Sequence, residues 1–133
     1  MKHIMRFGKK IKAGAVIHCG DWNNLKAVET VLSFRTTLYS VLGNADIDPK
    51  MGKKFERVYL EFELGNRKIG VVHSVKSLKL KFQNLDILFC GHDHMQGECI
   101  KDGLKIVNPG ALENAINFAV YDTNTNEVEF IND

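Results

Sequence analysis

The stretch "RVYLEFELGNRKIGVVHS" at residues 57–74 constrains the fold more than any other part of the sequence. Apolar and polar residues alternate before a Gly-Asn pair, and an apolar run returns after it. This pattern is typical of a β-hairpin in which one face of the first strand is buried and the other faces solvent. The sequence therefore predicts a sheet with one solvent-facing side.

Shorter apolar segments predict further strands and two helices. Residues 1–12 have roughly helical spacing and end at Ala13-Gly14, which is typical of a helix C-terminus. Apolar residues at 25, 28, 31 and 32 predict one face of a second helix over 23–34. Strands are predicted at 15–19, 37–43 and 86–90, in a hairpin at 98–110 with Asp102-Gly103 at its tip, and on both sides of "TNTN" at 123–126. This mixture of elements predicts an α/β fold.

Length and composition favour one compact domain. The chain has 133 residues, 44% of them hydrophobic, which is enough for a core of its own. We find no internal repeat, low-complexity tract or linker, and we expect a single domain over residues 1–133. The 18 basic and 16 acidic residues nearly balance, at a net charge of +2. This balance argues against an electrostatic grip on nucleic acid.

Hydropathy and cysteine usage predict a cytoplasmic protein without membrane contact. No apolar run approaches the ~20 residues of a membrane span, and residues 1–16 lack the apolar core of a secretory signal. Cys19, Cys90 and Cys99 form an odd set without a Cys-x-x-Cys pair, which fits a reducing compartment. Because each lies in an apolar run, we expect all three to be buried.

Several polar residues share one position in the pattern, shortly after an apolar strand and usually beside a glycine. They are Asp21, Asn44, His73, His92 and His94. The carboxyl ends of strands line ligand crevices in α/β folds. Each residue alone has a structural explanation as a turn former, a helix cap or a hydrogen-bonded strand end. Together they form a ligand set for a divalent ion such as Mn²⁺, Fe²⁺, Ni²⁺ or Zn²⁺.

The order of short motifs along the chain resembles the calcineurin-like metallophosphoesterases. The motifs are "HCGDW" at 18–22, "GNAD" at 43–46, "VVHS" at 71–74, "CGHDH" at 90–94 and "NPGA" at 108–111. The chain is most similar to the small bacterial and archaeal phosphodiesterases, a family that includes the retromer subunit Vps29. The resemblance implies an α/β fold in which a two-sheet β-sandwich is flanked by helices.

The resemblance also implies roles for the five polar residues. Asp21 would bridge two metal ions, and His94 would bind the first of them. Asn44, His73 and His92 would complete the second site. Manganese is the first choice of metal, with nickel, zinc, iron or magnesium as alternatives. Metal-activated hydroxide would hydrolyse a small phosphate ester, a phosphodiester in particular, so no catalytic side chain beyond the ligands would be needed.

Departures from the family pattern narrow these expectations. The sequence has no Asp-x-His motif before Asp21. We therefore expect an N-terminally truncated fold, one metal ion rather than two, and an uncovered sheet that favours homo-oligomers. His18 lies within a predicted strand and is expected to pack there rather than bind metal. Ala45 replaces the histidine that protonates the leaving group in larger members, a proton transfer that contributes about 10²–10⁴-fold to rates.

A second hypothesis shares the same fold. The missing Asp-x-His motif also fits a catalytically impaired protein-binding scaffold of the Vps29 kind, or a truncated remnant. Fold alone does not separate an enzyme from a scaffold. The sequence therefore leaves both functions open, with the metal-dependent phosphodiesterase as the first choice.

Overall fold

The computed structural model describes residues 2–22, 25–43, 46, 59–74, 84–91, 95–110 and 117–132. In chain order, its elements are α1 (Lys2–Lys10), β1 (Ala15–His18), α2 (Leu25–Leu32), β2 (Thr37–Ser40), β3 (Tyr59–Leu64), β4 (Arg67–Val72), β5 (Ile87–Phe89), β6 (Gly97–Lys101), β7 (Leu104–Asn108), β8 (Asn117–Asp122) and β9 (Glu127–Asn132). Each predicted helix and strand is present. The strand predicted at 37–43 is shorter than expected and ends at Ser40.

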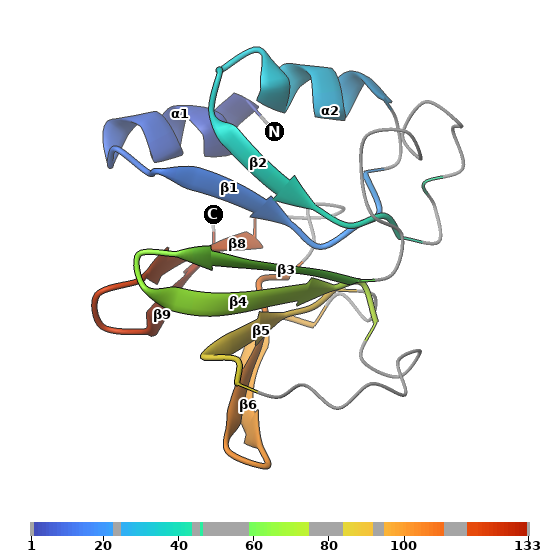
Figure 1. The fold of residues 1–133 in the computed structure, drawn as a ribbon. Helices are drawn as coiled ribbons and strands as arrows, with labels where there is room; N and C mark the ends of the chain where they lie inside the picture. The colour runs from blue at the N-terminus through green and yellow to red at the C-terminus, as the bar shows by residue number, and fades with distance from the viewer. Residues whose placement is uncertain are drawn as a thin grey trace.

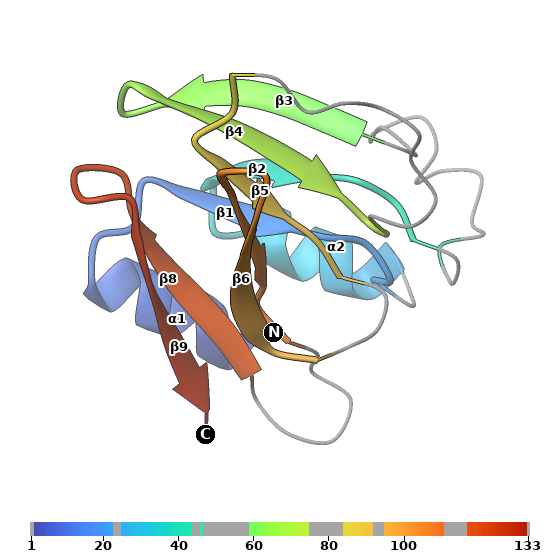
Figure 2. The ribbon, with the colours of Figure 1, turned by 90° about the horizontal axis from the view of Figure 1, so that it is seen from below.

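The strands form three ladders. β1 and β2 pair in parallel, five strands follow the order β3-β4-β5-β7-β6, and β8 pairs with β9 in antiparallel fashion. The β1–β2 pair lies between the helices and the five-stranded sheet (Figure 1). The β8–β9 hairpin lies alongside α1 (Figure 2), where Phe7 packs edge-on against Phe118. This arrangement confirms the predicted fold class, an α/β fold with stacked β layers flanked by helices.

An apolar core joins the β layers. The side chains of Ile69 and Val71 on β4 and Ile87 on β5 are fully buried in it. Tyr39 on β2 stacks on Phe62 of β3, with ring centroids 3.7 Å apart. The alternation in β3 has the predicted effect, because its apolar residues pack against this core while Glu61 and Glu63 are exposed.

A second apolar cluster holds the helices on the β1–β2 pair. Val28 and Val31 of α2 are fully buried there, together with Met5 of α1 and Trp22. The predicted apolar face of α2 is therefore correct at these positions. Leu32 is an exception, because 40% of the residue is exposed at the end of the helix.

Both predicted two-residue turns are present. Gly65 and Asn66 join β3 to β4 with φ angles of 56° and 63°, and Asp102 and Gly103 join β6 to β7 with φ angles of 53° and 79°. Two successive positive φ angles are the mark of a type I′ turn, the turn that matches the twist of a hairpin. The turns therefore fix the registers of these strand pairs.

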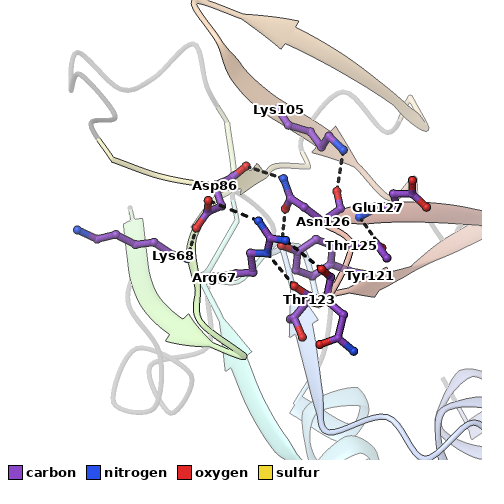
Figure 3. A network of polar contacts seen from close by, with 10 residues as sticks. Arg67, Lys68, Asp86, Lys105, Tyr121, Thr123, Thr125, Asn126 and Glu127 are labelled. Atoms are coloured by element: carbon purple, nitrogen blue, oxygen red, sulfur yellow. Dashed lines mark hydrogen bonds and ion pairs between the residues drawn. The ribbon is translucent and has the colours of Figure 1, made fainter.

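A polar network fastens the β8–β9 turn to the five-stranded sheet (Figure 3). Arg67 donates from Nε to the Thr123 carbonyl at 2.7 Å and from Nη2 to the Asn124 carbonyl at 3.1 Å. Asn126 donates to the backbone carbonyl of Asp86 at 3.4 Å. Arg67 is the first residue of β4, so the network lies at the opposite end of that strand from His73.

The expectation that all three cysteines are buried is wrong for two of them. All three are free thiols, but only Cys19 is buried; Cys90 is partly buried and Cys99 is exposed. Cys99 is exposed because β6 is the last strand of its sheet. Burial raises the pKa of the Cys19 thiol, and Cys90 adds to the shift. Among the described residues, no helix is long and apolar enough to cross a membrane.

Candidate metal centre

Several strand ends meet on one side of the molecule. The arrows of β1, β2 and β4 point the same way in Figure 1, and β4 runs parallel to β5. Cys19-Gly20-Asp21 follow β1, His73 follows β4, and Cys90-Gly91 follow β5. The candidate site therefore lies where the carboxyl ends of two separate sheets face each other, as ligand crevices in α/β folds do.

The carboxylate of Asp21 and the imidazole of His73 are in contact at this junction. Asp21 Oδ2 lies 3.3 Å from His73 Nε2, and the two side chains are 19% and 7% exposed, respectively. The structure thus brings together two residues that the sequence placed at the carboxyl ends of strands. Metal binding by this pair stays a prediction.

The backbone after β1 directs Asp21 into the junction. Gly20 has a φ angle of 98° and Asp21 a φ angle of 60°. Glycine adopts such conformations freely, and aspartate tolerates the left-handed region better than most residues. Two successive positive φ angles turn the chain sharply as it leaves the strand. The Gly-Asp pair is therefore needed for the shape of this loop.

Close backbone packing leaves no room for larger residues beside the pair. A Cβ atom on Gly20 would lie 2.7 Å from the backbone nitrogen of Gly43 and 2.7 Å from Nδ1 of His73. A Cβ atom on Gly43 would overlap the side chain of Asp21. The loops after β1 and β2 and the end of β4 therefore approach one another at van der Waals distance only because glycine occupies both positions.

The backbone carbonyl of Cys19 determines which nitrogen of His73 carries the ring hydrogen. Nδ1 of His73 lies 2.8 Å from this carbonyl oxygen. A carbonyl can only accept, so Nδ1 is the donor. In the neutral ring, Nε2 then presents a lone pair toward the Asp21 carboxylate; in the imidazolium it donates a hydrogen to it. The lone pair of Nε2 and the carboxylate oxygen therefore point toward the same place, as two ligands of one cation do.

The other predicted ligands lie outside the described residues: Asn44, His92 and His94. Among the residues that are described, no group of three or more His, Cys, Asp and Glu side chains could hold a metal ion. The sequence places Asn44 after Gly43 and His92 after Gly91, and the N–H of Gly91 donates to the carbonyl of His73 at 2.9 Å. The described part of the site supplies one carboxylate and one imidazole.

Comparison with known protein families identifies the superfamily of the chain. The family model of the calcineurin-like phosphoesterase superfamily domain matches residues 1–126. The chain belongs to the calcineurin-like phosphoesterase superfamily. This membership agrees with the resemblance carried by the short motifs between residues 18 and 111. No curated protein sequence matches the chain.

Solved structures share the fold of this chain. An archaeal phosphodiesterase aligns with a TM-score of 0.80 at 20% identity, over 98% of this chain and 90% of the other. The phosphoesterase YfcE from E. coli gives 0.68 at 15% identity, over 98% and 90%. Vacuolar protein sorting 29 from Cryptosporidium parvum gives 0.63 at 19% identity, over 95% and 86%. At these identities the likeness concerns the fold alone.

The donor atoms of Asp21 and His73 fit the divalent ions that calcineurin-like phosphoesterases generally use. A carboxylate and a neutral imidazole nitrogen are ligands that Mn²⁺ and its neighbours in the transition series accept. Metal-bound histidines commonly donate their other ring N–H to a backbone carbonyl, as His73 does to Cys19. The pair therefore suits one half of a phosphoesterase metal site.

Sequence reasoning missed two residues that shape the candidate site. Asp46 is 1% exposed, and its Oδ2 accepts a hydrogen bond from the N–H of Gly43 at 2.9 Å. Asn108 is buried and donates from Nδ2 to the carbonyl of Gly91 at 3.2 Å. Each holds the backbone directly before a predicted ligand. The signals for them in the sequence are the last residue of "GNAD" and the first residue of "NPGA".

His18 packs in the strand, as expected from the sequence. Its ring stacks on Trp22 with centroids 3.6 Å apart, and its Nδ1 accepts a hydrogen bond from the N–H of Gly20 at 3.1 Å. Burial lowers the pKa of His18 to about 3; Asp21 opposes this shift and His73 adds to it. His18 is therefore neutral at pH 7 and supports the Gly20-Asp21 turn.

We expect His18→Asn to weaken the acid sensitivity of the fold. Because the pKa of His18 is lower in the folded than in the unfolded chain, its contribution to stability is present above pH 6.5 and lost as the pH falls toward 3. The wild type should lose about 2 kcal/mol of unfolding free energy from this residue between pH 7 and pH 5. Denaturant unfolding at pH 7 and at pH 5, in the presence of EDTA, measures this loss. An equal loss in the variant, whose amide can still accept from Gly20, would contradict the prediction.

Proposed function

We propose that this chain is a metal-dependent phosphodiesterase acting on a small phosphate ester. The proposal rests on the contact between Asp21 and His73, in which the Cys19 carbonyl directs Nε2 of His73 toward the carboxylate. Asn44 and His92 complete the set of ligands. Mn²⁺ is the preferred ion, ahead of nickel, zinc, iron or magnesium.

The ligand set suits an anionic substrate. Asp21 contributes one negative charge, while His73, His92 and Asn44 are neutral donors. A single carboxylate leaves a bound divalent ion with net positive charge, which attracts a phosphodiester. Such an ion supplies neutralisation of the phosphoryl oxygens and activation of water. For a second ion, this sequence supplies only His94 and the shared Asp21 as ligands. We therefore propose that one ion binds more tightly than a second.

Substrates with good leaving groups suit this chain best. Ala45 follows Asn44, where larger members of the superfamily have a histidine that protonates the leaving group. Alanine has no proton to transfer, so a leaving group that needs protonation would depart slowly. We therefore propose activated phosphodiesters as the substrates that the chain hydrolyses most readily.

Hydrolysis of bis-p-nitrophenyl phosphate tests the proposal. The metal-free protein should be inactive, and added Mn²⁺ should restore a rate above that of Mn²⁺ alone. Equimolar Mg²⁺ and Ni²⁺ provide the comparison of metals. A rate no greater than the protein-free control with any of these ions would reject the phosphodiesterase. The protein-binding scaffold would then be the better hypothesis, and a stoichiometric partner in a pull-down would support it.

A further inference from the structure

Strand β6 is an edge strand that is exposed on both faces. It ends the five-stranded sheet, with β7 on one side and no strand of the described residues on the other. Glu98, Cys99, Ile100 and Lys101 are all exposed, although their side chains alternate between the two faces of the sheet. Ile100 is 72% exposed, which is unusual for an isoleucine in a sheet. An open edge with apolar character is a template for pairing with another strand.

The turn of the β6–β7 hairpin determines which backbone groups face outward. Lys101 and Leu104 flank the two-residue turn and are paired across the hairpin. Residues in this position exchange hydrogen bonds, and hydrogen-bonded pairs alternate along an antiparallel ladder. Cys99 therefore bonds inward to β7, whereas the N–H and C=O groups of Glu98 and Ile100 point away from it.

These outward groups are symmetric about Cys99. A second β6 strand that approaches in antiparallel direction can place its Ile100 opposite Glu98, and its Glu98 opposite Ile100. Cys99 then lies directly opposite Cys99 of the second copy, in a non-hydrogen-bonded pair with a Cα separation of about 4.5 Å. The arrangement has a two-fold axis and closes on itself, as an isologous interface does.

Charge favours this register over its neighbours. In the register centred on Cys99, Glu98 faces an isoleucine and Lys101 faces Gly97, so no like charges are opposed. A shift of two residues in one direction, the smallest that again pairs outward-facing groups, sets Glu98 opposite Glu98 of the second copy. A shift in the other direction sets Glu98 opposite Asp102. Like charges directly opposed across strands are destabilising.

The remaining side chains are compatible with the same register. Glu98 Oε1 lies 3.3 Å from Lys105 Nζ within the chain, so its charge is already paired beside the incoming strand. The two Ile100 side chains are diagonal neighbours across the axis and can bury part of their exposed surface against each other. Lys101 meets no side chain at Gly97.

We propose that two copies of this chain dimerise through antiparallel pairing of their β6 strands, centred on Cys99, into a continuous ten-stranded sheet. The proposal is independent of the phosphodiesterase activity. The sequence also led us to expect a homo-oligomer, but for a different reason, the missing Asp-x-His motif before Asp21. Pairing of one short strand buries little surface, so the dimer forms in a concentration-dependent manner.

Sedimentation under reducing conditions tests the pairing. The wild type should shift with concentration from the 15.0 kDa of one chain toward twice that mass. Ile100→Pro should remain at the mass of one chain, because proline removes an outward N–H without removing a bond to β7. Ile100→Thr, which keeps the N–H and the branched side chain, should still dimerise. A monomeric wild type at every concentration would overturn the proposal.

Disulfide trapping tests the register and does not depend on the proline variant. Diamide, which takes up the two thiol hydrogens as a disulfide forms, should convert the wild type to a covalent dimer, because a Cα separation of about 4.5 Å is within disulfide range. Cys99→Ser should lose this product. Lys101→Cys in the Cys99→Ser background should not regain it, because position 101 lies opposite position 97. A covalent dimer in Cys99→Ser, or equal trapping at position 101, would overturn the proposal.

Discussion

Asp21→Asn is expected to reduce Mn²⁺-dependent hydrolysis of bis-p-nitrophenyl phosphate by more than ~100-fold. Residues that only orient a metal ligand typically contribute about 10–100-fold, and Asp21 is proposed as a ligand itself. Asparagine keeps the size of the side chain and one oxygen but removes the negative charge. Activity should therefore fall through loss of bound metal, and Mn²⁺ titration calorimetry should show the loss of affinity directly.

Arg67→Ala is the matched control for this charge removal. Arg67 lies at the far end of β4 and fastens the β8–β9 turn through backbone carbonyls. Its loss should lower the free energy of unfolding by about 1–3 kcal/mol without changing Mn²⁺ affinity. If Asp21→Asn retained wild-type affinity and rate, or if both variants lost activity in proportion to stability, the role assigned to Asp21 would be wrong.

Gly20→Ala is expected to damage the fold and the site together. The added methyl group would lie 2.7 Å from the Gly43 nitrogen and from Nδ1 of His73, at a φ angle of 98° that alanine rarely adopts. Backbone strain and overpacking together should cost about 2–4 kcal/mol. Relief of the overlap displaces either the loop after β2 or the His73 ring, so Mn²⁺ affinity should also fall. Denaturant unfolding and calorimetry measure the two effects.

Gly14→Ala is the control for this substitution. A Cβ atom on Gly14 would meet no atom within 4 Å, and the residue does not have a positive φ angle. Its stability should stay within about 0.5 kcal/mol of the wild type, as is usual for surface substitutions. Equal stability of the two variants would show that the close approach of Gly20, Gly43 and His73 does not exist in solution.

The local elements could be predicted because the signals for them are local. Gly65-Asn66 and Asp102-Gly103 are the residue pairs that type I′ turns require, and both turns are present. Alternation in β3 likewise predicted which of its residues face the core. These features depend on neighbouring residues, and a single sequence contains all the information needed.

Features that depend on distant segments could not be predicted in the same way. Cys99 was expected to be buried, yet its exposure follows from the position of β6 at the end of the sheet, which its own residues do not specify. Likewise, the contact between Asp21 and His73 joins two sheets, and the hydrogen bond that orients His73 comes from a backbone carbonyl. Before the fold was known, such positions were linked only by their shared place after apolar strands and by the order of the family motifs.

The central claim is that Asp21 and His73 bind the same divalent ion. Anomalous diffraction from crystals grown with Mn²⁺, recorded at the manganese edge, locates the ion directly. We expect a peak between the two side chains, about 2.0–2.6 Å from an Asp21 carboxylate oxygen and from His73 Nε2. An ordered Mn²⁺ elsewhere, or no peak while Asp21 Oδ2 and His73 Nε2 stay in direct contact, would contradict it.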